Sequence, residues 1–334
     1  MNQQAAVLPV ALLTSLLTLN LVPAHAAEAL AMQDAAVWLQ RMSDAARKVS
    51  YEGVFVMQHG AGMQTLSIFN RPVGSAKESR LAAMDGIERE IRCSETGSIS
   101  RVMEGGQVRL EKRLNSRYFP DLLPPDATAL ANWYSVKMGK HARVAGLECR
   151  QIEIVPKDVY RWGYVLCADK DTGLPLKAMM VNAAGQPLMQ YAFAEIRIGG
   201  QPRIDSSKDS KVRQSEWLMP ASHPTTRPIS LETVNVTNLP PGFSRISAVK
   251  RRLPNKADEV EHWVFSDGLT HVSLFLEPAA HPIKSIRGQS KQGMINMVKL
   301  QVGPMQATVL GDAPWPAIEA IAMGLEAPTG NARQ

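Results

Sequence analysis

The sequence predicts an α+β protein with two domains, each built on an antiparallel sheet. The main observation is the segment from Val144 to Ile198, where four runs rich in Val, Ile, Tyr, Phe and Met are separated by turn-forming residues. Runs of this length and spacing are typical of consecutive antiparallel strands. An amphipathic helical pattern precedes them, and a second set of strand-like runs begins near Ile229, after a stretch without hydrophobic periodicity.

The N-terminal segment has the features of a secretory signal. The first charged side chain is Glu28, and the apolar stretch before it closes with Ala24-His25-Ala26. A short hydrophobic run followed by an A-x-A site predicts cleavage, here after Ala26. A retained membrane anchor would need about 20 apolar residues, and Asn20 and Pro23 shorten the run. We therefore expect residues 1–26 to be removed from an exported protein.

The first domain is expected to cover residues 27–198. Its first element is a helix over Leu30–Val49, because apolar side chains recur there at three- and four-residue spacing. A hairpin about His59–Gly62 and further short strands follow, and Pro124-Pro125 then forces a loop. The remaining expected elements are strands near 88–92, 98–103 and 107–110 and a second short helical stretch near 127–133. This order predicts a strongly curved sheet that covers helices.

Large apolar side chains are expected on the concave side of that sheet. Tyr51, Phe55 and Met57 alternate onto one face of the first strand, and Met179 and Met180 contribute one side chain to each face of a later strand. Methionine recurs at surfaces that accept varied apolar ligands. We take Tyr51, Phe55, Met57 and Met179 as candidates for a lipid pocket, with an ordinary filled core as the alternative.

Two cysteines lie within the four-strand segment. If the first hairpin turns about Asp158, positions whose numbers sum to about 316 lie opposite one another, which places Cys149 across from Cys167. Such a pair is close enough for a disulfide, and export favours one. Two unrelated buried thiols are the alternative. Cys93 is left outside this pair, and the sequence does not decide its role.

A linker and a second domain complete the chain. Residues 199–228 are dense in Ser, Lys, Arg, Pro and Gly and predict an interdomain linker. The second domain is expected over 229–326, with strands on either side of a hairpin at Ser266-Asp267-Gly268 and a closing helix at Pro316–Leu325. One helix on a small antiparallel sheet is the simplest fold for it. Residues 327–334 are a tail.

The charge of the chain favours acidic or lipid partners. The net charge is +6 and the isoelectric point is near 9.2. Outside the cytoplasm, this excess points less to nucleic acid than to anionic lipid, lipopolysaccharide or an acidic polypeptide. Lys250, Arg251, Arg252 and Arg113 are the candidates for binding a partner or a phosphate. The alternatives are an ordinary solvated surface and a charged strand edge that prevents aggregation.

Signatures of catalysis are missing from the sequence. It contains no G-x-S-x-G, no Walker loop and no H-E-x-x-H. Ser247 and Lys250 fit S-x-x-K, but in a strand these two side chains would point to opposite faces. The histidines of the second domain match no compact ligand spacing. We expect no enzyme, no metal and no cofactor, and a hydrolase using Ser247 remains a weak alternative.

Several short motifs, in this order and spacing, resemble the periplasmic sigma-E factor regulatory proteins of the RseB/MucB family. The resemblance covers nearly the whole mature length. The motifs are Met84-Asp85-Gly86 with Arg89-Glu90, Gly146–Cys149, Arg161-Trp162-Gly163-Tyr164, Asp171–Pro175, Leu239–Phe243, Phe265–Leu269 and Val309–Asp312.

The resemblance implies a binding protein of the periplasm. It implies a half-open antiparallel barrel over helices, like that of LolA and LolB, joined to a smaller α+β domain. Family members bind the periplasmic part of an anti-sigma factor of the RseA/MucA kind and shield it from proteolysis. The resemblance also implies that lipopolysaccharide or lipoprotein acyl chains release the anti-sigma factor. Some members lack one of the two meander cysteines, so a disulfide would reinforce the fold without being required. A general lipid or lipoprotein carrier is the alternative function, no nucleic acid is expected, and a homo-oligomer stays open.

Overall fold

We describe a computed structural model of the chain. It describes residues 24–73, 76–94, 97–104, 107–114, 117–200, 227–229, 234–253, 258–282, 284–289 and 294–327, without the side chains of 24–33 and of some strand-end residues. Most of the expected signal segment and most of the expected linker therefore lie outside the described residues, and both stay predictions. No helix within the described ranges is long and apolar enough to span a membrane.

The first domain consists of a long helix, a short 3-10 helix and a large sheet. The helices are α1, Ala24–Lys48, and η1, Thr128–Asn132. The strands in chain order are β1 Tyr51–His59, β2 Gly62–Val73, β3 Ala76–Ala83, β4 Arg89–Ser94, β5 Gly97–Glu104, β6 Gln107–Leu114, β7 Tyr134–Val144, β8 Leu147–Pro156, β9 Gly163–Asp169, β10 Pro175–Val181 and β11 Pro187–Ile198. The expected four-strand meander is confirmed as β8 to β11, whereas β3 and β7 were not predicted.

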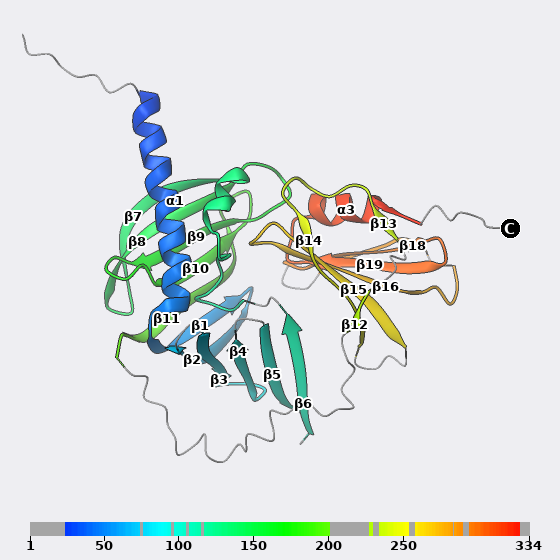
Figure 1. Cartoon of the computed structure of the whole chain (residues 1–334), viewed down its shortest axis with the longest axis horizontal. Coiled ribbons are helices and arrows are strands. Elements are labelled where there is room, and N and C mark those ends of the chain that lie inside the picture. Colours follow the sequence, from blue (N-terminus) through cyan, green and yellow to red (C-terminus); the bar gives the residue numbers. More distant parts are fainter. Residues whose placement is uncertain are drawn as a thin grey trace, which may run out of the picture.

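These strands form one antiparallel sheet that curves around α1. Their order is β6-β5-β4-β3-β2-β1-β11-β10-β9-β8-β7. α1 lies against β7, β2 and β10, which are far apart in that order, so the sheet must wrap around the helix (Figure 1). In the described part of the chain, β6 and β7 are the outer strands and do not pair with each other. The predicted half-open barrel is confirmed.

The inner face of the sheet and α1 share one core. From α1, the residues Ala35, Leu39, Met42, Ala45 and Ala46 are at most 4% exposed. Their three- and four-residue spacing puts them on one side of the helix, where they join buried side chains of most strands in a single cluster. The predicted amphipathic helix is confirmed.

The predicted disulfide is confirmed, but the strand register behind the prediction was wrong. Cys149 and Cys167 are bonded, with their Cα atoms 5.5 Å apart. Cys149 lies opposite Asp169 and Cys167 lies opposite Gln151, so the bond crosses diagonally between β8 and β9. The turn is longer than assumed, which shifts the register by two residues. A shift of two keeps both side chains on the same face of the sheet, and the pair still meets.

The second domain is an antiparallel sheet covered by one helix. Its sheet has the order β12-β14-β15-β16-β19-β18-β17, and a small two-stranded sheet joins β13 to β20. The strands are β12 Arg227–Pro228, β13 Asn235–Val236, β14 Ser244–Arg252, β15 Glu259–Ser266, β16 His271–Pro278, β17 Ile286–Gln289, β18 Asn296–Val302, β19 Met305–Gly311 and β20 Leu325–Glu326. The helix α3, Trp315–Met323, packs on β18 and β19 with Ile318 and Ile321 buried. The predicted hairpin and closing helix are confirmed.

Candidate functional site: an aromatic cluster beside the domain junction

The residues chosen from sequence for a lipid pocket do not all lie together. Tyr51 is 2% exposed and its hydroxyl donates to the Ala46 carbonyl 3.2 Å away. Phe55 is 1% exposed, and Met57 is half-buried against the same core. Met179 was misplaced: successive strand residues alternate between faces, and on β10 the core side belongs to Leu176, Ala178 and Met180.

Four aromatic rings meet on the inner face of the sheet. Phe55 on β1 lies opposite Phe193 on β11, with ring centroids 5.8 Å apart. Phe119 stacks on Tyr191 at 5.3 Å and lies 5.1 Å from Phe55 and 5.2 Å from Phe193. We call Phe55, Phe119, Tyr191 and Phe193 the aromatic cluster. Three of its rings come from strands, and only Phe119 comes from a loop.

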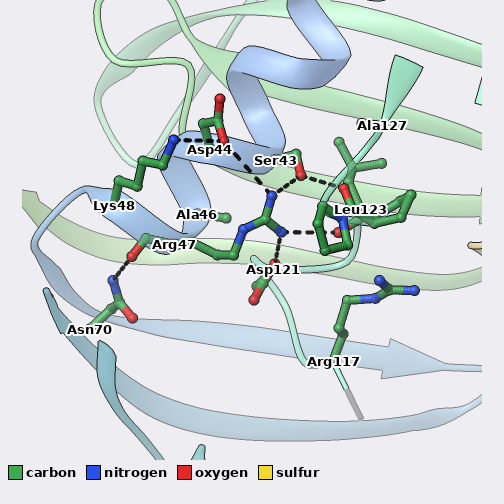
Figure 2. Close-up of polar contacts among 12 residues, drawn as sticks. Ser43, Asp44, Ala46, Arg47, Lys48, Asn70, Arg117, Asp121, Leu123 and Ala127 are labelled. Atoms are coloured by element: carbon green, nitrogen blue, oxygen red, sulfur yellow. Dashed lines mark hydrogen bonds and ion pairs between the residues drawn. The ribbon is translucent and has the colours of Figure 1, made fainter. Parts of the chain in front are cut away.

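The loop that carries Phe119 is hydrogen-bonded to side chains of α1. Arg47 donates to Asp121 Oδ1 at 3.1 Å and to the Leu123 carbonyl at 3.4 Å, as Figure 2 shows. Ser43, which accepts a hydrogen bond from Arg47, donates in turn to the Pro124 carbonyl. One polar face of the helix therefore holds residues 121–124 and keeps Phe119 against the sheet.

The second domain is joined to the first through the carboxylate of Asp267. Asp267 Oδ2 accepts from the Tyr134 hydroxyl at 2.8 Å and from Arg161 Nη1 at 3.0 Å. Its other oxygen accepts from the backbone N–H groups of Leu269 and Thr270 at 3.0 and 2.8 Å. The side chains of Arg161 and Asp267 are both 0% exposed. The carboxylate is thus fully hydrogen-bonded at the place where the domains meet.

Arg161 is the centre of this junction. Within its own domain it pairs with Asp158 at 2.9 Å. Across the junction it donates to the Pro241 carbonyl, and its guanidinium carbon lies 5.4 Å from the ring centroid of Phe243. The rings of Trp133 and Tyr134 are each 5.5 Å away on the first-domain side. Such surroundings stabilise a buried guanidinium by paired hydrogen bonds and ring contacts.

The two domains also exchange apolar side chains. Leu269, in the turn between β15 and β16, belongs to the core of the first domain and is 8% exposed. Tyr160, in the turn between β8 and β9, packs against the core of the second domain. Arg117 donates to the Gly268 carbonyl at 2.7 Å. We call Ser266–Thr270 the docking turn, because it is the part of the second domain that enters the first.

Tyrosines between the aromatic cluster and the docking turn are held protonated. Burial, and secondarily the carboxylate of Asp312, raises the pKa of Tyr191 to about 12. Burial followed by Asp312 and Asp267 raises the pKa of Tyr164 well above its ordinary value. Because both carboxylates belong to the second domain, Tyr164 and Tyr191 lie within electrostatic range of it. The aromatic cluster and the junction are therefore neighbours.

The basic residues chosen from sequence lie elsewhere, on the second sheet. Lys250, near the end of β14, pairs with Glu261 at 3.4 Å, and the backbone of Arg252 lies opposite Glu259. Arg251 lies between them on the same strand. The backbone of Arg113 is in β6 opposite Ser98, but its side chain is outside the described part of the structure.

Two features considered from the sequence, the S-x-x-K match and a metal site, can be compared with the described residues. Ser247 and Lys250 lie on the same strand, β14, as expected, so the S-x-x-K match lacks its helical geometry. Nowhere in the described ranges do three or more His, Cys, Asp or Glu side chains gather in a way that could hold a metal ion.

Comparison with known proteins gives the family. The model of the MucB/RseB N-terminal domain matches residues 34–217, and that of the MucB/RseB C-terminal domain matches residues 230–326. The chain belongs to the MucB/RseB family. The sigma factor AlgU regulatory protein MucB of Pseudomonas aeruginosa is 29% identical over 87% of this chain and 90% of its own. The sigma-E factor regulatory protein RseB of Escherichia coli K12 is 27% identical over 71% and 73%.

Solved structures show the similarity over most of the chain. The complex of P. aeruginosa MucA and MucB superimposes with a TM-score of 0.70 at 27% identity, covering 89% of this chain and all of the matched one. A structure of MucB alone gives a TM-score of 0.57 at 25% identity, with coverage of 88% and 98%. Three of the motifs that suggested the family, those around Arg161, Phe243 and Asp267, meet at the domain junction.

Proposed function

We propose that this chain is a periplasmic negative regulator of an envelope-stress sigma factor. It would bind the periplasmic part of an anti-sigma factor and protect that part from proteolysis. The observation that carries the proposal is the match of both domains to the MucB/RseB family, together with the similarity of 89% of the chain to MucB in complex with MucA. The relatives' names as sigma factor regulatory proteins support the regulatory part.

We further propose that acyl chains of lipopolysaccharide or lipoproteins release the partner. The supporting feature is the aromatic cluster on the inner face of the sheet, of which one member sits on a loop and could be replaced by a ligand. Acyl chains bind such apolar surfaces with about 0.8 kcal/mol per buried methylene. Phe55, which belongs to the cluster, and Tyr51 and Met57 on the same strand remain our candidates for the lipid pocket. We assign contacts with the partner or with lipid phosphates to Lys250, Arg251, Arg252 and Arg113.

The first test is a binding titration. The mature chain is titrated with the periplasmic segment of the anti-sigma factor from the same organism, with and without lipopolysaccharide. We expect tight binding that the lipid reverses. A parallel digestion with the site-one protease should show the segment protected in the complex and cleaved after lipid is added. Failure of the segment to bind would contradict the proposal.

A general lipid or lipoprotein carrier is the second candidate, because the aromatic cluster alone would suit that function. A carrier would capture lipid without binding the anti-sigma segment. The same titration separates the two, since it measures partner binding and lipid capture on one protein.

A further inference from the structure

An acyl chain that enters the core of the first domain must displace side chains that are already packed there. The interior is close-packed, so a chain can enter only where something leaves. Phe119 is held by a loop and Leu269 by the docking turn, whereas the other rings of the cluster are fixed in paired strands. Loop and turn residues move at lower cost than residues inside a hydrogen-bonded sheet.

The segments that carry Phe119 and Leu269 contact each other. Arg117, two residues before Phe119, donates to Gly268 in the docking turn at 2.7 Å. A Cβ placed on Gly268 would lie 3.4 Å from Leu130 Cδ2 and 3.4 Å from Pro124 Cγ, so the turn rests on the segment that follows Phe119. Movement of Phe119 away from Tyr191 would therefore displace the first-domain residues that contact the docking turn.

We propose that the docking turn and an acyl chain compete for the inner face of the first domain, so that lipid binding undocks the second domain. The inference rests on the proposed lipid-sensitive binding of the anti-sigma segment, and adds its physical cause. Lipid and partner then favour different domain arrangements, which is the condition for one ligand to expel the other.

The docked arrangement is assigned to the partner-binding state. This chain superimposes on MucB with MucA at TM-scores of 0.70 and 0.69, and on MucB alone at 0.57. By this measure the chain as described is more similar to the MucB found with MucA than to MucB alone. Docking closes the aromatic cluster while the partner is held, and undocking opens it to lipid.

A disulfide between the docking turn and the segment of the first domain that it contacts tests whether the turn and an acyl chain compete. A Cβ on Gly268 would be 3.8 Å from Pro124 Cβ, within the range of disulfide bonds. We would make Pro124→Cys/Gly268→Cys in a Cys93→Ala background, with Gly268→Cys alone as the matched control. Gly268 has a φ of 106°, and the single variant carries the same backbone strain without the bond.

The readouts are partner affinity and capture of two probes, lipopolysaccharide and a synthetic lipopeptide, each with its deacylated form as control. We expect the oxidised double variant to bind the anti-sigma segment with the same affinity as the single variant. Its affinity for either acylated probe should be lower by a factor of about ten or more. Added probe should not release its partner. Mild reduction should restore both the capture of lipid and the release of the partner by lipid. The wild type is reduced in the same way, as a control for effects of breaking the native disulfide.

The opposite perturbation uses Asp267→Asn, which weakens docking without a new bond. It should capture more of the acylated probes and bind the segment more weakly. The inference is overturned if the oxidised double variant captures lipid as the wild type does, if lipid still releases its partner, or if it no longer binds the segment. If instead the wild type itself fails to bind the segment, or keeps it in the presence of lipid, the proposed function fails.

Discussion

Replacing Asp267 by Asn should weaken the docking of the second domain by about 2–4 kcal/mol. The change removes the charge that accepts hydrogen bonds from Tyr134 and Arg161 at 2.8 and 3.0 Å. Hydrogen bonds to charged groups contribute about 1.5–3 kcal/mol each, and removing one partner of a buried ion pair costs about 3–5 kcal/mol when the other charge is left alone. Arg161 is not left alone, because Asp158 still holds it at 2.9 Å, so the lower part of these ranges applies.

Urea denaturation followed by tryptophan fluorescence measures this loss. With a slope of about 2 kcal/mol per molar urea, a loss of about 3 kcal/mol moves the midpoint down by about 1.5 M. Glu319→Gln is the matched control, since it removes one charge from a surface ion pair with Arg287 at 2.6 Å, where the side chains are 31% and 68% exposed. Exposed pairs contribute at most about 1 kcal/mol. Equal midpoints for the two variants would refute the argument that Asp267 holds the domains together.

Three further changes test other parts of the chain. Replacing Cys149 and Cys167 by Ser should lower the free energy of unfolding by about 3 kcal/mol, because the bond closes a loop with a sequence separation of 18; an unchanged thermal midpoint would contradict this. Arg252→Ser, at an exposed position, should weaken binding of the anti-sigma segment several-fold with stability within about 0.5 kcal/mol, whereas Lys137→Ser on the first domain should leave affinity unchanged. Because the pKa of Tyr191 is raised to about 12 in the folded protein, its contribution to the free energy of unfolding is fully present below pH 10 and is lost as the pH rises to 12. Tyr191→Phe should therefore reduce the loss of stability between pH 10 and pH 12 by up to about 3 kcal/mol. Identical pH profiles of stability for the variant and the wild type would contradict this.

The regular elements were predictable because their signals are local. Alternating apolar residues gave the strands from β8 to β11, and three- and four-residue spacing gave α1. β7 was missed because its sequence, with Gly139, Lys140 and His141 in the middle, lacks the alternation of a half-buried strand. Its pairing with β8 is irregular between Met138 and His141, which explains the interrupted pattern.

The site was less predictable because it depends on contacts between distant segments. Phe119 lies in a proline-containing loop with no periodicity, so nothing local marks it as buried. Asp267 was recognised as part of a turn, but its pairing with Arg161, 106 residues earlier, depends on how the domains dock. The register error about Asp158 has a similar cause. Asp158 accepts hydrogen bonds from the Tyr160 N–H and the Arg161 side chain, which builds a longer turn than the sequence indicated.

The energy of docking must fall within a window for the proposed switch to work. A docked state populated at about 99% needs an advantage of about 2.7 kcal/mol, and reversing the ratio to 1:99 requires a ligand that favours the undocked state by about 5.5 kcal/mol. An acyl chain of about twelve methylenes that leaves water gains about 10 kcal/mol, which suffices after part of it is used to displace Phe119. The contribution of the Asp267 carboxylate to docking is similar to the advantage of about 2.7 kcal/mol that a docked population of about 99% needs. Its loss would therefore leave the domains near balance, with partner binding weakened even when no lipid is present.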